Sequence, residues 1–281
     1  MNLFLTTLFH FKSVFLTLFC SIIGAFIGSF LNVVIYRLPK IMEQQWRAQS
    51  HRENFPKESF KIITARSQCS HCGHVFGLVQ KIPLLGYFLL RGKCQYCKNR
   101  ISVRYPLVEL LSSLIIAFIC WHFGLSVFAL MVSIFGLALM TLAFIDLETE
   151  LLPDVITLPL LWIGLLFNLY GGLTDLPSAV IGAAVGYLSL WLIYWLFKLI
   201  TFKEGMGHGD FKLLATIGAW FGWQLLPIVV LLSSVLASII GIAMVVFIKH
   251  DREMPIPFGP YLVIAAMGTL FFSRALIEVL Y

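Results

Sequence analysis

Long apolar runs separated by short polar breaks dominate the hydrophobic pattern of this chain. Runs of about 18 or more apolar residues are typical of transmembrane helices, and runs of this kind fill almost all of the sequence after Pro106. With one further run near the N-terminus, the pattern predicts about eight helices, over residues 13–36, 107–122, 126–145, 155–171, 177–199, 211–223, 226–248 and 258–279. We therefore expect an all-α polytopic membrane protein.

Two of these apolar runs differ from a simple transmembrane helix, one by its length and the other by its place near the N-terminus. The apolar stretch 211–247 would reach about 55 Å as one helix, which is much more than a bilayer core, so we expect it to fold back near Pro227. The first run follows a segment whose one cation is Lys12, without a convincing small-residue cleavage site. We therefore interpret it as a retained helix and not as a removed signal peptide.

Composition and charge support a membrane protein and suggest its orientation. The chain is 59% hydrophobic and only 12% charged, whereas soluble domains are about 25% charged. Residues 37–105 hold thirteen of the twenty Lys and Arg residues and only three acids, so the positive-inside rule places this segment in the cytoplasm. If the eight predicted helices cross the membrane alternately from this segment, eighteen of the twenty Lys and Arg residues lie on the cytoplasmic side. Both termini then lie in the periplasm. We interpret the basic segment as a topology signal and expect no nucleic acid partner.

Four cysteines form two CxxC pairs in the basic segment: Cys69, Cys72, Cys94 and Cys97. Four thiolates make a closed tetrahedral structural zinc site, and a small polar segment gains stability from such a metal. The alternative, two disulfides, is disfavoured in a reducing cytosol. The sequence thus predicts a first helix (residues 1–36), a cytoplasmic zinc-ribbon-like domain (37–105) and a seven-helix core (106–281). Cys20 and Cys120 lie in apolar runs and are interpreted as small core residues.

Acidic residues near the bilayer are the candidates for chemistry, because ionisable groups are costly in membrane helices. Asp146 ends one apolar run and Asp210 begins another, both at cytoplasmic helix ends, so they could meet. Two adjacent carboxylates share one proton, one acting as base on a water and the other polarising a peptide carbonyl. Because a helix N-terminus favours negative charge, we expect Asp210 to be the base and Asp146 the acid. Asp154, after Pro153, is interpreted as a structural residue in a first helical turn.

Three glycines precede the second aspartate, in the stretch "GMGHGDFKLL". Without Cβ atoms at Gly205, Gly207 and Gly209, a substrate backbone could approach the aspartate closely. The alternative is a plain helix-start turn with Asp210 as its cap. From spacing alone, both interpretations stay open.

The stretch "GMGHGDFKLLATIGAWFG" resembles the signature of the prepilin peptidases, the type IV leader peptidases within the GxGD aspartyl proteases. Five further segments match that family in order: "GSFLNVVIYRLP", "RSQC", "LLRGKCQYCKNRISVRYPLVELL", "IDLETELLPD" and "IPFGPYL". The resemblance implies that Asp146 and Asp210 are catalytic and that Cys69, Cys72, Cys94 and Cys97 bind zinc. Departures are Ala65, Ser70 and the pair Gly86–Tyr87, all in the cytoplasmic segment.

The resemblance also implies an activity. We expect cleavage of type IV prepilins or type II secretion pseudopilins after the glycine that ends a basic leader, at the cytoplasmic face of the bacterial inner membrane. We also expect methylation of the new N-terminal residue with S-adenosylmethionine, although no glycine-rich nucleotide loop marks a site for it. Because residues 37–105 are themselves basic, we expect Glu148, Glu150 and Glu204 to attract the leader. Two alternatives remain: a peptidase without methylation, and a proton-coupled transporter or secretion scaffold.

Overall fold

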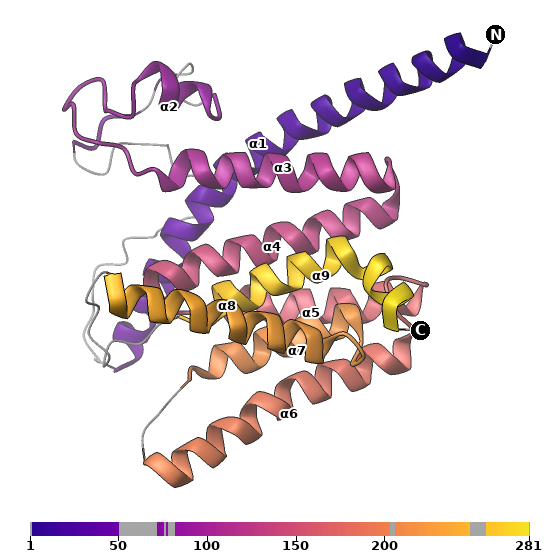
Figure 1. Ribbon diagram of the computed structural model, residues 1–281. Helices are drawn as coiled ribbons and strands as arrows, with labels where there is room; N and C mark the ends of the chain where they lie inside the picture. The colour runs from indigo at the N-terminus through magenta and orange to yellow at the C-terminus, as the bar shows by residue number, and fades with distance from the viewer. Residues whose placement is uncertain are drawn as a thin grey trace. The chain divides into compact units, whose positions relative to one another are not determined.

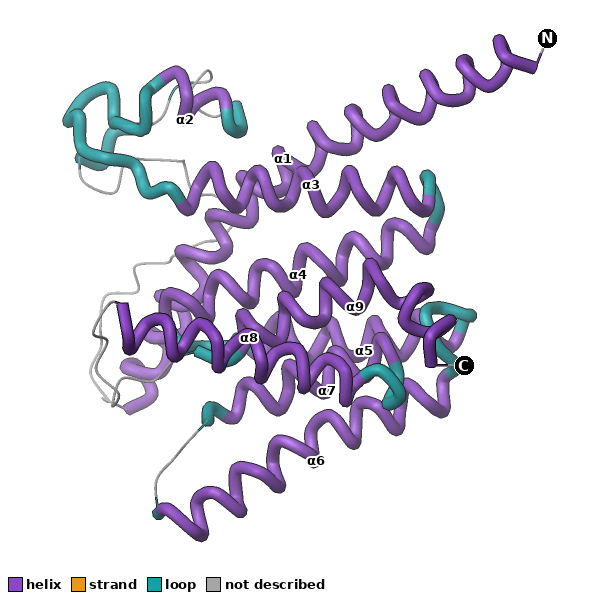
Figure 2. Tube along the Cα trace, in the orientation of Figure 1, coloured by secondary structure: helices purple, strands orange, loops and turns teal. Residues whose placement is uncertain are grey.

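The computed structural model describes residues 2–50, 72–75, 77, 82–202, 206–247 and 257–280, with side chains from 14 to 47 and up to 271. Within these ranges the named elements are all helices, and an isolated antiparallel bridge joins Lys93 and Arg100 (Figures 1 and 2). The all-α prediction is confirmed. The chain divides into two compact units, residues 1–137 and 138–281, and α4 runs from the first into the second.

The first unit is organised around one antiparallel helix pair. Its elements are α1 (Asn2–Ser50), α2 (Leu85–Leu89), α3 (Arg104–Phe123) and the first half of α4 (Val127–Thr149). Small residues bring α1 and α3 close together: a Cβ added to Gly24 would lie 2.8 Å from the carbonyl oxygen of Ser112, and the hydroxyls of Ser21 and Ser113 are 2.7 Å apart. At the other end of the pair, Asn32 donates to the carbonyl of Tyr105 at 3.0 Å.

Helix α1 is longer than the hydrophobic pattern predicted. The expected helix ended at Tyr36, whereas α1 continues through Pro39 to Ser50. The added turns, "IMEQQWRAQ", consist of good helix formers, and Glu43 pairs with Arg47 one turn away. The beginning of the basic segment is therefore an extension of the first helix.

The second unit is built around a short buried helix. Its elements are the end of α4, α5 (Asp154–Leu169), α6 (Leu176–Thr201), α7 (His208–Phe221), α8 (Leu226–Phe247) and α9 (Gly259–Leu280). Helix α7 contacts α5, α6, α8 and α9, and every residue from Asp210 to Phe221 is buried except Lys212. It is about 21 Å long at 1.5 Å per residue, so its neighbours enclose it.

Glycines set the distance between α6 and α7. A Cβ added to Gly218 would lie 2.2 Å from the carbonyl oxygen of Gly182, and one added to Gly186 would lie 2.7 Å from that of Leu214. These contacts are with backbone atoms, which cannot rotate away. The two helices therefore pack backbone to backbone, as small residues allow in membrane proteins.

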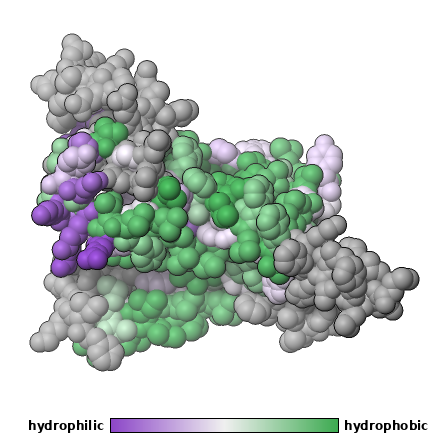
Figure 3. Space-filling view, turned by 90° about the horizontal axis from the view of Figure 1, so that it is seen from above, coloured by the Kyte–Doolittle hydropathy of each residue, from purple (hydrophilic) through white to green (hydrophobic). Residues whose placement is uncertain are grey.

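Among the described residues, five helices are long and apolar enough to cross a membrane, and they comprise residues 14–47, 104–123, 127–149, 176–201 and 226–246. Many large apolar side chains are exposed on them, and much of the surface visible in Figure 3 is apolar. All eight predicted segments are helical, but α5 and α7 have only 16 and 14 residues, so the count of eight spans stays a prediction. The predicted break in 211–247 is present: α7 ends at Phe221, Gly222 follows with φ 79°, and α8 begins one residue before Pro227.

Candidate active site

Asp146 lies in the last turn of α4, with only 5% of its surface exposed. Its Oδ2 accepts a hydrogen bond from the backbone N–H of Gly259 at 3.1 Å. Gly259 is the first residue of α9, where the N–H groups lack partners within the helix. A Cβ on Gly259 would lie 2.6 Å from that oxygen, so only glycine allows this contact.

Asp210 lies in the first turn of α7 and is 7% exposed. Its Oδ1 is buried and has no hydrogen-bond partner among the described residues. The charge of Asp146 acts on Asp210 electrostatically, so the fold brings together two carboxyl groups that are far apart in sequence. Their catalytic role remains a prediction.

The glycines before Asp210 have different surroundings. Gly207 precedes α7 as its N-cap, and a Cβ added there would make only ordinary van der Waals contacts, the nearest atom being Asp210 Oδ2 at 3.8 Å. Gly209 has less space, because a Cβ there would lie 2.8 Å from the Cβ of Leu152. Gly205 lies outside the described residues. Close packing against Leu152 inside the protein therefore explains the glycine at position 209.

Leu152 touches the backbone beside both aspartates. Besides its contact with Gly209, its Cδ1 would lie 3.5 Å from a Cβ on Gly259. The residue is partly exposed and belongs to the loop between α4 and α5. Sequence reasoning missed it, because a leucine in the stretch "ELLPD" gives no signal that distinguishes it from its neighbours.

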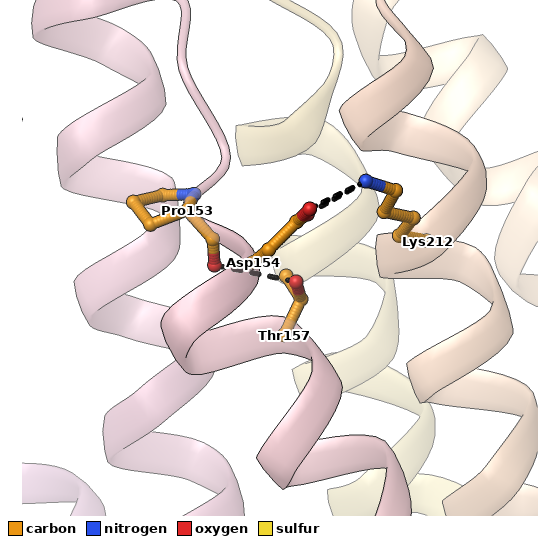
Figure 4. Close-up of polar contacts among 4 residues, drawn as sticks. All are labelled: Pro153, Asp154, Thr157 and Lys212. Atoms are coloured by element: carbon orange, nitrogen blue, oxygen red, sulfur yellow. Dashed lines mark hydrogen bonds and ion pairs between the residues drawn. The ribbon is translucent and has the colours of Figure 1, made fainter. Parts of the chain in front are cut away.

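A series of polar contacts fixes α7 against α5. Lys212 donates to both carboxylate oxygens of Asp154, at 2.8 and 2.7 Å (Figure 4). One turn further along α7, the hydroxyl of Thr216 donates to the carbonyl of Thr157 at 3.2 Å. Another turn on, Trp220 Nε1 donates to the carbonyl of Leu160 at 2.9 Å. Residues four apart lie on one helix face, so each turn of α7 is held in register and Asp210 is held at its end.

Asp154 and Asn168 hold the two ends of α5. Asp154 is in the first turn, as the sequence predicted, but its pairing with Lys212 was not foreseen. Asn168 is buried and makes four hydrogen bonds: its Nδ2 donates to the carbonyls of Ala219 and Trp220, and its Oδ1 accepts from the N–H groups of Leu173 and Thr174. The side-chain amide is thus fully satisfied, which fixes the far end of α7.

A cluster of thiols lies in the first unit. The sulfur atoms of Cys72, Cys94 and Cys97 all lie within 4.8 Å of one another, and those of Cys72 and Cys94 are 3.9 Å apart. Sulfurs bound at 2.3 Å around a tetrahedral zinc ion are about 3.8 Å apart, so the spacing fits. Cys69, the fourth predicted ligand, lies outside the described residues.

The second CxxC pair lies in a tight, hydrogen-bonded turn. The N–H of Cys94 donates to the carbonyl of Asn99 at 2.9 Å, and the carbonyl of Cys94 accepts from the N–H of Lys98 at 3.0 Å. Lys98 adopts φ 55°, which closes the turn after Cys97. The turn orients both sulfurs toward Cys72. The antiparallel bridge between Lys93 and Arg100 flanks it.

Glu109 on α3 is a buried acid outside the aspartate pair. It is only 8% exposed, and its Oε2 accepts the N–H of Leu84 at 2.8 Å. Leu84 has φ 61°, a rare conformation for a residue with a side chain. The buried carboxyl therefore holds the loop before α2 against the start of α3.

Comparison with known proteins gives a consistent result along the whole chain. Residues 22–123 match the bacterial peptidase A24 N-terminal domain, and residues 133–242 match the type IV leader peptidase family. The prepilin leader peptidase/N-methyltransferase of Pseudomonas putida is 49% identical over 255 residues, covering 89% of this chain and 88% of that protein. The corresponding proteins of Pseudomonas aeruginosa and Aeromonas hydrophila are 47% and 48% identical over 90% and 89% of this chain, and over 90% and 88% of their own length.

No solved structure matches the chain. The first family match ends with α3 at residue 123, and the second begins within α4 at residue 133 and contains both aspartates. Near-complete coverage at almost half identity leaves no large segment of the chain outside the comparison. The chain therefore belongs to the type IV leader peptidase family.

Proposed function

We propose that this protein cleaves the leader from type IV prepilins or type II secretion pseudopilins at the cytoplasmic face of the bacterial inner membrane. We also propose that it methylates the new N-terminal residue, as the names of its relatives state for those proteins. The observation that carries the proposal is the pair of buried aspartates, Asp146 and Asp210, which lie at the ends of two helices and near enough for the charge of Asp146 to act on Asp210. Aspartyl proteases catalyse peptide hydrolysis with two adjacent carboxyl groups that share one proton.

The two aspartates perform hydrolysis by moving protons. One carboxylate removes a proton from a water molecule as the water attacks the peptide carbonyl carbon. The other, protonated, carboxyl donates to the carbonyl oxygen and so stabilises the charge that develops there. The hydrogen bonds of Lys212, Thr216 and Trp220 to α5 support this chemistry, because they hold the helix that carries Asp210.

We propose that α5, α7 and α9 also lie in the bilayer, which gives eight membrane helices in all. Helix α7 is too short to span a bilayer with 14 residues, but its burial among α5, α6, α8 and α9 allows it to lie within one. With residues 37–105 in the cytoplasm and both termini in the periplasm, both aspartates face the cytoplasmic side. A prepilin helix in the same bilayer would present its leader there.

We propose a structural zinc ion on Cys72, Cys94 and Cys97, with Cys69 as the fourth ligand. Four thiolates leave no open position for a water, so the ion would stabilise the domain of residues 37–105 and take no part in catalysis. The methyl donor of the second activity would be S-adenosylmethionine, and we assign no residues to its site. The spacing of the three described sulfurs supports the zinc proposal.

The proposal is tested with purified protein and a prepilin peptide, with and without S-adenosylmethionine. We expect wild type to release the leader and, with the methyl donor, to add one methyl group detected by mass spectrometry. Asp146→Asn and Asp210→Asn should abolish cleavage, while Glu43→Gln, an acid-to-amide change on an exposed part of α1, should not. Normal cleavage by either aspartate variant would contradict the proposal; cleavage without methylation would leave only the peptidase.

A further inference from the structure

The two aspartates have unlike surroundings, although their side chains are almost equally buried. Asp146 accepts a backbone N–H bond from Gly259, whereas the buried Oδ1 of Asp210 has no hydrogen-bond partner among the described residues. We propose that Asp146 carries the negative charge and is the general base, while Asp210 holds the shared proton and is the general acid. This inference rests on the proposed function and reverses the assignment expected from the sequence.

The N–H of Gly259 favours a charged Asp146. An N–H can only donate, and a bond to an ionised acceptor is stronger than one to a neutral acceptor. The donor is also at the N-terminus of α9, where helix dipoles favour an anion. The 3.1 Å contact therefore stabilises the carboxylate more than it would stabilise the carboxylic acid.

In the part of the chain that the structure describes, no group donates a hydrogen bond to the buried Oδ1 of Asp210. Its own backbone N–H is directed to the carbonyl of Gly207 at 3.3 Å. A buried carboxylate oxygen that accepts no hydrogen bond has lost its hydration without compensation, so the charged form of the carboxyl group is destabilised. A protonated Asp210 reduces this cost, and its O–H can then donate to the neighbouring carboxylate of Asp146.

Other charged groups around the pair act more weakly. The N-terminus of α7 favours charge on Asp210, and Glu150, one turn beyond Asp146, opposes charge on Asp146. Glu150 is exposed to solvent, which screens its effect. Lys212, two residues after Asp210, is engaged by Asp154. A direct hydrogen bond at Asp146 and a missing one at Asp210 therefore decide the distribution.

The assignment fixes the order of proton transfers. Asp146 takes a proton from the water molecule as the water oxygen bonds to the carbonyl carbon. At the same time Asp210 gives its proton to the carbonyl oxygen. When the C–N bond breaks, Asp146 donates that proton to the leaving nitrogen. The hydroxyl of the tetrahedral intermediate returns its proton to Asp210 as the new carboxyl group forms. Both aspartates finish in their starting states.

Infrared spectroscopy of protein with ¹³C-labelled aspartate carboxyls tests the inference without measuring activity. The label separates aspartates from Glu109 and the other glutamates, and alanine variants remove one member of the pair without adding an amide donor. At neutral pH we expect Asp146→Ala to keep the protonated-carboxyl band of Asp210 and Asp210→Ala to lose it. The opposite pattern, or the same result in both variants, would overturn the inference.

A second pair of variants tests the role of Gly259. In the Asp210→Ala background, Gly259→Ala places a Cβ 2.6 Å from Asp146 Oδ2 and displaces the donor, so the protonated band should return. Gly268→Ala is the matched control on the same helix, since its Cβ would have no atom within 4 Å. A band that returns in both variants, or in neither, would contradict the role given to the Gly259 N–H.

The wild-type enzyme gives an independent measurement, which does not depend on the folding of a variant. An epoxide reagent is attacked by a carboxylate, which forms an ester as the ring C–O bond opens and the alkoxide takes a proton. We expect peptide mass mapping to find the ester on Asp146; an ester on Asp210, or none, would contradict the inference. If the amide variants are inactive but the ester is on Asp210, only this inference fails. If they cleave normally, the proposed function fails.

Discussion

Lys212 on α7 donates to both carboxylate oxygens of Asp154 at the start of α5, across 58 residues of sequence. Lys212 follows Asp210 by two residues along α7, and the side chains of Lys212 and Asp154 are both partly exposed. Because exposed ion pairs contribute only about 0–1 kcal/mol to stability, the main effect of this pair would be on the position of Asp210.

Breaking this ion pair should reduce activity more than stability. We expect Lys212→Met to lower kcat about 10-fold, since small displacements of a catalytic group are costly, with the free energy of unfolding reduced by less than about 1 kcal/mol. The measurements are cleavage kinetics and thermal unfolding in detergent. The charge-swapped double variant Asp154→Lys/Lys212→Asp should recover part of kcat, and a double variant no better than either single one would argue against the role.

The two glycines beside Asp210 should respond differently to alanine. Gly209→Ala brings a Cβ to 2.8 Å from Leu152, so we expect cleavage to fall at least about 10-fold as the backbone before Asp210 shifts. Gly207→Ala brings a Cβ only to an ordinary contact distance of 3.8 Å from Asp210 Oδ2, and it should lower cleavage at most a few-fold, through a poorer helix cap. Equal loss in both would show that substrate approach, and not packing against Leu152, requires these glycines.

Close packing of α6 on α7 should make Gly218 important for stability. Gly218→Ala places a Cβ 2.2 Å from a backbone oxygen of Gly182, and we expect the free energy of unfolding to fall by about 1–3 kcal/mol. Gly268→Ala, with no neighbouring atoms, should be neutral or stabilising by up to about 1 kcal/mol. Thermal unfolding in detergent measures both, and equal melting temperatures for the two variants would rule out the proposed contact.

Metal content should distinguish the two groups of cysteines. Elemental analysis should find about one zinc ion per chain, with loss of zinc in Cys69→Ser, Cys72→Ser, Cys94→Ser and Cys97→Ser. Cys20→Ser and Cys120→Ser are the controls: these residues are buried in α1 and α3, and their sulfurs contact each other at 2.7 Å. Zinc retained in all four of the first variants would refute the site.

Acidic side chains after Asp146 should attract the basic leader. Glu148 and Glu150 are exposed at the end of α4, whereas Glu204 lies outside the described residues. Replacing all three with Lys should raise KM several-fold at low salt, with a smaller effect at high salt because surface charges are screened. Unchanged cleavage of a basic-leader substrate would show that the leader is bound elsewhere.

The chemistry-bearing residues could be found without coordinates because they interrupt a regular pattern. An aspartate at either end of an apolar run is energetically costly in a membrane and therefore conspicuous. Asp146 ends such a run and Asp210 begins one. Two CxxC pairs are similarly conspicuous in a short polar segment, and three of their four sulfurs do lie together. Helix positions followed from Gly, Pro and charged breaks, with α1 the main exception, because good helix formers continued it past Tyr36.

The contacts around those residues could not be found in this way. A soluble helix shows its buried face by an amphipathic pattern, but in a bilayer both the lipid-facing side and the packed side are apolar. Nothing in the apolar runs therefore identified α7 as the enclosed helix, Leu152 as the neighbour of Gly209, or Gly259 as the donor to Asp146. The expected roles of the two aspartates were based on helix ends alone for the same reason.

The sequence by itself determined which segments are helical, which groups are ionisable or can bind metal, and the family of the chain, because all of these depend on residue type and local order. The tertiary structure alone decided which aspartate receives a hydrogen bond, because that bond comes from a helix 113 residues away in sequence. The distribution of charge between two acids depends on such long-range donors. For that reason it is a property of the packed helices and not of either sequence motif.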